Sequence, residues 1–188
     1  MRATTTLSIG ILTALTALGA SAQTRNATPV PQDRSIVTAE ASRDTPSNKN
    51  TEDVDFLVEA MRTGLAEVQL GELAAQRSYD PRVRDYGTKL KNDHGAQVAE
   101  LERMLQPLRV SIPTEPSTKA QAQHAALARL TGEQFDAAFI AAMIASHMEA
   151  IEQYGAQTHA NPDRALADFA SKSLPVLREH LAMAESLR

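Results

Sequence analysis

Four long stretches of this chain repeat apolar residues at the spacing of one helix face, and turn or capping residues separate them. Recurrence at i, i+3, i+4 and i+7 indicates amphipathic α-helices, whereas strands would alternate apolar and polar residues. No stretch shows that alternation over a strand length. The sequence therefore predicts an all-α fold with long helices over Val54–Tyr79, Pro81–Leu108, Thr131–Thr158 and Asp163–Leu187.

The links between these helices predict how they pack. Asp80-Pro81 and Asn161-Pro162-Asp163 are short breaks, which favour antiparallel neighbours. The middle connection is longer: Arg109–Thr118 contains two prolines and leads into a short helix over Lys119–Leu130. We predict an antiparallel four-helix bundle with one short extra helix in the middle connection.

Local signals refine this prediction. Thr51 or Asp53 is expected to cap the first helix, and Thr131 with Gln134 resembles a capping box. Gly64 and Gly71 lie seven residues apart, which indicates a line of close helix contact.

Pro175 falls inside the fourth helix and predicts a kink, because proline cannot donate a backbone hydrogen bond.

The N-terminal segment is typical of an exported protein. Arg2 is followed by an apolar run, Leu7–Leu18, which is too short to span a bilayer comfortably, and then by Ala20-Ser21-Ala22. We interpret residues 1–22 as a signal peptide cleaved near Ala22; the alternative is a short membrane anchor. Residues 23–50 have few large apolar groups and predict a disordered linker before a domain over 51–188. The expected location is periplasmic or secreted.

Composition excludes several classes of site and partner. The chain has no cysteine, so disulfides and thiolate metal sites are excluded. Removing residues 1–22 takes away one arginine and no acid, which changes the formal charge from −4 to −5. A mildly acidic chain without a basic cluster argues against nucleic acid. No integral membrane insertion is expected, and the partner is left open between another envelope protein and a second copy of this chain.

Each long helix carries one titratable residue inside its apolar stripe. These residues are Glu67, His94, His147 and His180. Glu67, His94 and His147 lie near the midpoints of their helices and should share one layer. His180 lies about five residues past its midpoint, roughly 7 Å at the rise of an α-helix. The sequence therefore predicts that three of them meet, with the fourth close by.

Two interpretations of this layer remain open. Three imidazoles and one carboxylate suit a single Zn²⁺, Cu²⁺ or Fe²⁺ ion. Alternatively, Glu67 and the histidines form a metal-free polar network that fixes the packing of the helices. No histidine has a glutamate three residues before it, which argues against the Glu-x-x-His di-iron centres of ferritin-like bundles.

Other polar residues are weaker candidates for the layer. His124 and His159 are expected in solvent. Glu72 also touches an apolar stripe and is a weaker rival to Glu67. Tyr86 and Tyr154 are placed to offer hydroxyl groups. Asp93 and Glu179 precede His94 and His180 and point about 100° away on their helices, which suggests acids at the surface or behind the histidines.

Several short motifs resemble one known family. They are Asp55-Phe56, Glu67-Val68-Gln69-Leu70-Gly71, Asn92-Asp93-His94, Phe135–Ile140 with His147, and Leu174-Pro175 with Glu179-His180. From about Asp53 to Leu187 the chain resembles the ferritin-like exported bacterial proteins of domain-of-unknown-function family 4142, often labelled predicted outer membrane protein. The resemblance implies a ferritin-like four-helix fold and export, places the four layer residues on family motif positions, and implies no established activity.

The function expected from these features is non-enzymatic. The chain has no phosphate-binding glycine loop, no Gly-x-Ser-x-Gly and no His-Glu-x-x-His. We predict a cell-envelope protein that binds a metal ion or small ligand at the buried layer, with a role in stress protection. The alternatives are a structural or partner-binding bundle and, more remotely, a redox enzyme that uses a bound metal.

Overall fold

The computed structural model describes residues 51–188, except for the side chains of His159 and Ala160. The predicted signal peptide (1–22) and linker (23–50) lie outside the described residues.

The regular elements of the described part of the chain are all helices, which confirms the all-α prediction. Residues 51–188 contain no strand. The elements are α1 (Thr51–Arg77), α2 (Pro81–Leu105), the 3₁₀ helix η1 (Gln106–Leu108), α3 (Thr118–Leu127), α4 (Gly132–Ala160) and α5 (Arg164–Ser186). None of these helices is both long enough and apolar enough to cross a membrane.

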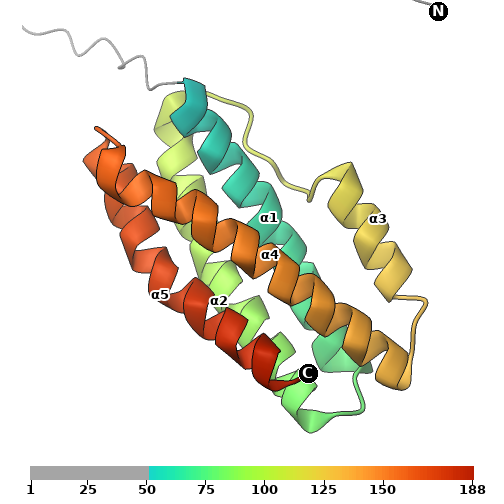
Figure 1. Ribbon diagram of the computed structural model, residues 1–188. Helices are drawn as coiled ribbons and strands as arrows, with labels where there is room; N and C mark the ends of the chain where they lie inside the picture. The colour runs from blue at the N-terminus through green and yellow to red at the C-terminus, as the bar shows by residue number, and fades with distance from the viewer. Residues whose placement is uncertain (1–50) are drawn as a thin grey trace, which may run out of the picture. The chain divides into compact units, whose positions relative to one another are not determined.

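The four long helices lie side by side in two close pairs (Figure 1). The most extensive contacts are between α1 and α2 and between α4 and α5. The pairs meet where α2 contacts α5 and α1 contacts α4, and α3 contacts both α1 and α4 from outside. Each long helix therefore turns one face toward the others, as its apolar stripe requires.

Three predicted helix starts are confirmed, at Pro81, Thr131 and Asp163, but two predicted caps are wrong; Thr51 is the first residue of α1 rather than its cap. Asp80 caps α2 by accepting from the Arg82 N–H at 2.8 Å, and Asp163 caps α5. Asp53 is instead inside the first turn of α1, where its carboxylate accepts a 2.6 Å hydrogen bond from Asn161 Nδ2. Thr131 precedes α4 but makes no side-chain cap hydrogen bond, so the capping box is absent. We attribute this to the left-handed Gly132 (φ 57°), which turns the backbone directly after Thr131.

Helix ends also differ slightly from the prediction. The chain tightens into η1 after Leu105, because Pro107 has no N–H to continue the α-helical pattern. The short helix spans Thr118–Leu127, and the Ser117 hydroxyl caps it by accepting from the Ala120 N–H at 3.2 Å. α5 continues without a break through Pro175.

Glycines set the close approach of α1 to α2, as the sequence predicts. A Cβ on Gly71 would lie 2.6 Å from the Gly87 carbonyl oxygen and 2.8 Å from the Lys91 nitrogen. A Cβ on Gly64 would lie 2.8 Å from Val98 Cγ2. Glu67 lies between these two glycines on the same helix face, so the tight contact carries it against α2.

The apolar core consists of two clusters. One is built around Tyr86, Phe135 and Phe139, and the other around Leu57, Tyr154 and Phe169. All four long helices contribute to both clusters. The four polar residues singled out from the sequence lie between them.

Candidate metal centre

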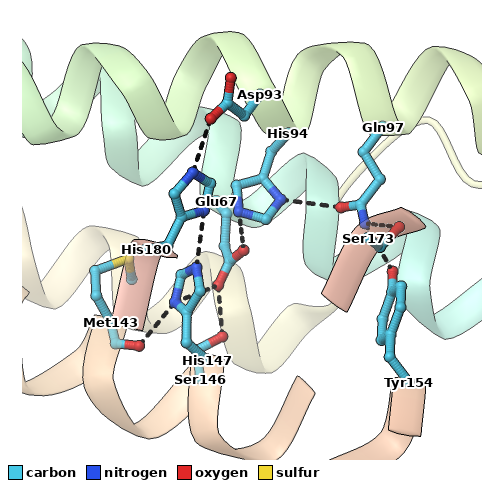
Figure 2. Close-up of polar contacts among 10 residues, drawn as sticks. All are labelled: Glu67, Asp93, His94, Gln97, Met143, Ser146, His147, Tyr154, Ser173 and His180. Carbon is cyan, nitrogen blue, oxygen red and sulfur yellow. Dashed lines mark hydrogen bonds and ion pairs between the residues drawn. The ribbon is translucent and has the colours of Figure 1, made fainter. Parts of the chain in front are cut away.

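The structure brings together all four residues that interrupt the apolar stripes (Figure 2). Glu67 comes from α1, His94 from α2, His147 from α4 and His180 from α5. Glu67 and His94 are each 3% exposed, and His147 and His180 are 0% exposed. Because burying a polar group without a partner is costly, each polar atom of this layer is expected to have a hydrogen-bond or ion partner.

Glu67 contacts both its neighbours through separate oxygens. Its Oε1 accepts a 2.6 Å hydrogen bond from the Ser146 hydroxyl and lies 3.7 Å from His147 Nδ1. Its Oε2 lies 2.7 Å from His94 Nε2. This contact is an ion pair when His94 is protonated, and His94 Nε2 has no other polar partner in residues 51–188.

His147 and His180 each use one ring nitrogen on an acceptor. His147 Nδ1 lies 2.8 Å from the Met143 carbonyl oxygen, and His180 Nε2 lies 2.8 Å from Asp93 Oδ2. A carbonyl oxygen and a carboxylate only accept, so both of these nitrogens carry hydrogen. The other two nitrogens, His147 Nε2 and His180 Nδ1, face each other at 3.3 Å.

The tautomer of His94 follows from a chain of hydrogen bonds. The Ser173 hydroxyl donates to the Phe169 carbonyl oxygen at 2.9 Å, so its oxygen accepts from Gln97 Nε2 at 3.2 Å. Gln97 Nε2 also donates to the Tyr154 hydroxyl at 3.1 Å. The Gln97 carbonyl oxygen therefore faces His94 Nδ1, 3.0 Å away, and that nitrogen donates.

All three imidazoles thus donate outward, and His147 and His180 each keep one nitrogen without hydrogen. The outward acceptors are the Gln97 amide, the Met143 carbonyl and the Asp93 carboxylate. The three rings bring one nitrogen each to within 4.8 Å of the others. Metal-binding histidines are held in this way, since the outer hydrogen bond fixes both the ring and the tautomer.

The surrounding charges and burial shift the pKa values of the three histidines in different directions. Burial alone would lower the pKa of His94, but the nearby Glu67 charge and the hydrogen bond to Gln97 outweigh it and raise that pKa. Burial lowers the pKa of His147 and of His180, and the charge of His94 adds to the effect. Burial would raise the pKa of Glu67, but the charge of His94 and the hydrogen bond from Ser146 hold it far below its usual range. At neutral pH, Glu67 is therefore ionised while His147 and His180 are neutral.

The weaker sequence candidates fall outside the cluster or behind it. Glu72 is exposed and pairs with Lys91 at 3.3 Å, and His124 is half-buried on α3. The side chain of His159 lies outside the described residues. Asp93 supports His180, as the sequence suggests, and Lys89 pairs with it at 3.1 Å.

Glu179 is a surface acid that pairs with Lys89 at 3.2 Å. Of the two tyrosines, Tyr154 joins the layer through Gln97, whereas the buried Tyr86 hydroxyl has no hydrogen-bond partner in the described part of the chain.

Sequence reasoning missed the residues that orient the layer. Ser146 directly precedes His147, and Gln97 follows His94 by three positions on the same helix face. A search for polar residues one turn from each buried histidine finds Gln97. No side-chain signal points to the Met143 carbonyl.

Comparison with known proteins identifies the family but no activity. The family model described as "Domain of unknown function (DUF4142)" matches residues 20–187. The chain belongs to this family. Curated proteins give no significant match.

The fold is similar to a solved structure, "Crystal structure of DUF305 fragment from Deinococcus radiodurans". The TM-score is 0.64 at 19% sequence identity, over 72% of this chain and 94% of that chain. The two share a fold.

Proposed function

We propose that this domain binds one transition-metal ion between Glu67, His94, His147 and His180. The observation that carries the proposal is the facing pair of ring nitrogens, His147 Nε2 and His180 Nδ1. Both bear lone pairs, because the other nitrogen of each ring donates to an acceptor. Two lone pairs 3.3 Å apart repel unless a proton or a cation lies between them.

A cation suits this gap better than a proton. Burial lowers the pKa of both rings, which disfavours a second proton on either one. Tetrahedral ligands at about 2.0–2.1 Å from an ion lie about 3.3–3.4 Å from one another. The observed 3.3 Å therefore matches the spacing of two ligands of one ion.

The donor set indicates the class of ion. Imidazole nitrogens suit Zn²⁺, Cu²⁺ and Fe²⁺, and the nearby Glu67 carboxylate supplies a fourth donor and a negative charge. One ion per chain is proposed, because His94, His147 and His180 each offer one ligand atom to a single cluster.

A metal-free network is the second candidate, and one contact favours it. His94 Nε2 lies 2.7 Å from Glu67 Oε2, and protonated His94 would neutralise the buried carboxylate without any ion. In that case the layer fixes the packing of the helices and the domain serves a structural or partner-binding role.

The wider setting of the site is also a proposal. We infer that the four long helices form an antiparallel bundle of the ferritin-like class, because consecutive long helices pair closely and the polar layer lies between two apolar clusters. We further propose that residues 1–22 direct export to the cell envelope, where a metal-binding domain is suited to stress protection. N-terminal sequencing of the processed protein should then begin at Gln23; an intact Met1 would contradict export.

Thermal unfolding with added metal tests the metal site against the network. A metal site predicts that equimolar or excess Zn²⁺ or Cu²⁺ raises the melting temperature of the wild type, because the ion binds the folded state. His147→Ala should remove this rise, whereas His124→Ala, a histidine outside the layer, should keep it. A network predicts no response to metal in the wild type and a loss of about 1–3 kcal/mol in His147→Ala from unpaired buried groups.

A further inference from the structure

A cleft of about 490 Å³ connects the buried layer with the surface. Its walls are α1 and α4, and α3 with its capping residue Ser117 contributes a third wall, which includes Lys119, Ala120 and Gln123. α3 lies outside the long helices on this side (Figure 1) and buries only Leu127. Glu67 and Ser146 both line the cleft, so it ends at the candidate metal centre.

Glu67 faces both the cleft and the imidazoles. Its Oε1 is held by the Ser146 hydroxyl, which also lines the cleft, and its Oε2 lies against His94 Nε2 (Figure 2). An ion bound first through Oε1 would therefore only have to move across the Glu67 carboxylate to reach the imidazole nitrogens that face it.

The charges along the cleft favour a cation. Glu59, Glu67 and Glu149 line it together with Arg62 and Lys119, so acidic groups exceed basic ones. Arg62 already pairs with Glu59 at 3.5 Å. Glu149 is exposed, and its Oε1 accepts a hydrogen bond from the neutral amide of Gln153 at 3.1 Å. Glu149 therefore presents a carboxylate to an incoming cation.

A second groove, of about 330 Å³ between α2 and α5, reaches the other side of His94. Asp93, His94 and Gln97 line it. On this side an ion would meet the N–H of His94, which donates to Gln97, and Asp93, which already holds His180 and Lys89. The lone pairs of the imidazoles point away from this groove, so it is the poorer route to them.

We propose that a divalent cation reaches the imidazoles through the cleft between α1 and α4, and that Glu67 passes it from the cleft to His94. This inference rests on the proposed metal site and adds its path and its carrier residue. The ligand is the hydrated cation itself, which exchanges water for a carboxylate oxygen and then for ring nitrogens.

The test measures the rates of Zn²⁺ binding and of Zn²⁺ release to a coloured chelator by stopped-flow absorbance. Ala145 lines the cleft and is exposed, so Ala145→Leu should obstruct the path without disturbing the core. Ala99→Leu is the control, an exposed alanine on α2 that does not line the cleft. Thr63→Leu narrows the cleft from α1 and replaces Ala145→Leu if that variant fails to fold. Val176→Phe obstructs the second groove.

The proposal expects Ala145→Leu to slow binding and release by the same factor, about tenfold, with an unchanged equilibrium constant. Ala99→Leu and Val176→Phe should keep wild-type rates. Glu149→Gln should slow binding at low salt, and Glu185→Gln, an exposed acid on α5, should not.

Wild-type rates in both Ala145→Leu and Thr63→Leu would overturn the path, as would slowing in Val176→Phe alone. If the wild type binds no Zn²⁺ at equilibrium, the proposed function itself is overturned. If the wild type binds Zn²⁺ but the cleft variants keep its rates, only the proposed path is overturned.

Discussion

Replacing Gly71 by alanine should push α1 and α2 apart. The new Cβ would lie 2.6 Å from the Gly87 carbonyl oxygen, 0.8 Å short of the 3.4 Å at which ordinary contact begins. The contacted atoms include the backbone of α2, which cannot rotate away as a side chain can. Overpacking of this kind costs about 1–3 kcal/mol.

A matched control separates packing from helix propensity. Gly155 is also within a helix, but a Cβ there meets nothing within 4 Å. Gly155→Ala should therefore stabilise the protein by about 0.5–1 kcal/mol through helix propensity alone. The same propensity gain acts in Gly71→Ala, where the clash should match or exceed it.

Urea unfolding followed by far-ultraviolet circular dichroism measures both variants. Gly71→Ala should lie below Gly155→Ala in unfolding free energy by about 1–3 kcal/mol, the packing cost alone. If Gly71→Ala is as stable as Gly155→Ala, the glycine contact does not hold the two helices together and the reasoning fails.

Three further predictions concern the layer and its neighbours. Tyr86→Phe should leave the unfolding free energy unchanged or raise it, because the Tyr86 hydroxyl is buried without a hydrogen-bond partner among the described residues. Tyr154→Phe should lower it by about 0.5–1.5 kcal/mol, because the acceptor of Gln97 Nε2 is lost. Equal losses of the two variants in chemical denaturation would contradict this difference. Asp93→Asn should weaken metal binding about 10–100-fold in calorimetric titration by altering the support of His180, and an unchanged affinity would count against the arrangement. Because the pKa of His94 is raised, an ion that binds at pH 6 must displace the proton of His94. Calorimetry in buffers of different ionisation enthalpy should show release of about one proton per ion, and fewer as the pH rises past that pKa. No proton release at any pH would be inconsistent with His94 as a ligand.

Much of the helical fold is predictable from the sequence, because the residues that share a helix face lie only three or four positions apart in the chain. Apolar periodicity located all four long helices to within a few residues, and Pro81 and Asp163 marked two of their starts. The error at Thr131 is different in kind. A capping box depends on one backbone conformation, and the left-handed Gly132 changes it.

The candidate site was predictable in its members and not in its geometry. Glu67, His94, His147 and His180 stand out because each interrupts an apolar stripe. Equal depth predicts that the first three meet, and the structure brings His180 to them as well. Which nitrogen of each ring faces inward depends on acceptors such as the Met143 carbonyl, and a backbone carbonyl has no signature in the side-chain pattern. Tautomers therefore required the three-dimensional structure.

X-ray absorption spectroscopy of the Zn²⁺-loaded protein tests the central claim most directly, because it reports the ligands around the ion. The account predicts one ion per chain, a first shell at about 2.0–2.1 Å and the outer-shell signature of three imidazoles with one oxygen donor. The same spectrum from His124→Ala should be unchanged. A shell of oxygen atoms alone, a single imidazole, or a protein that retains no zinc would contradict a metal centre at Glu67, His94, His147 and His180.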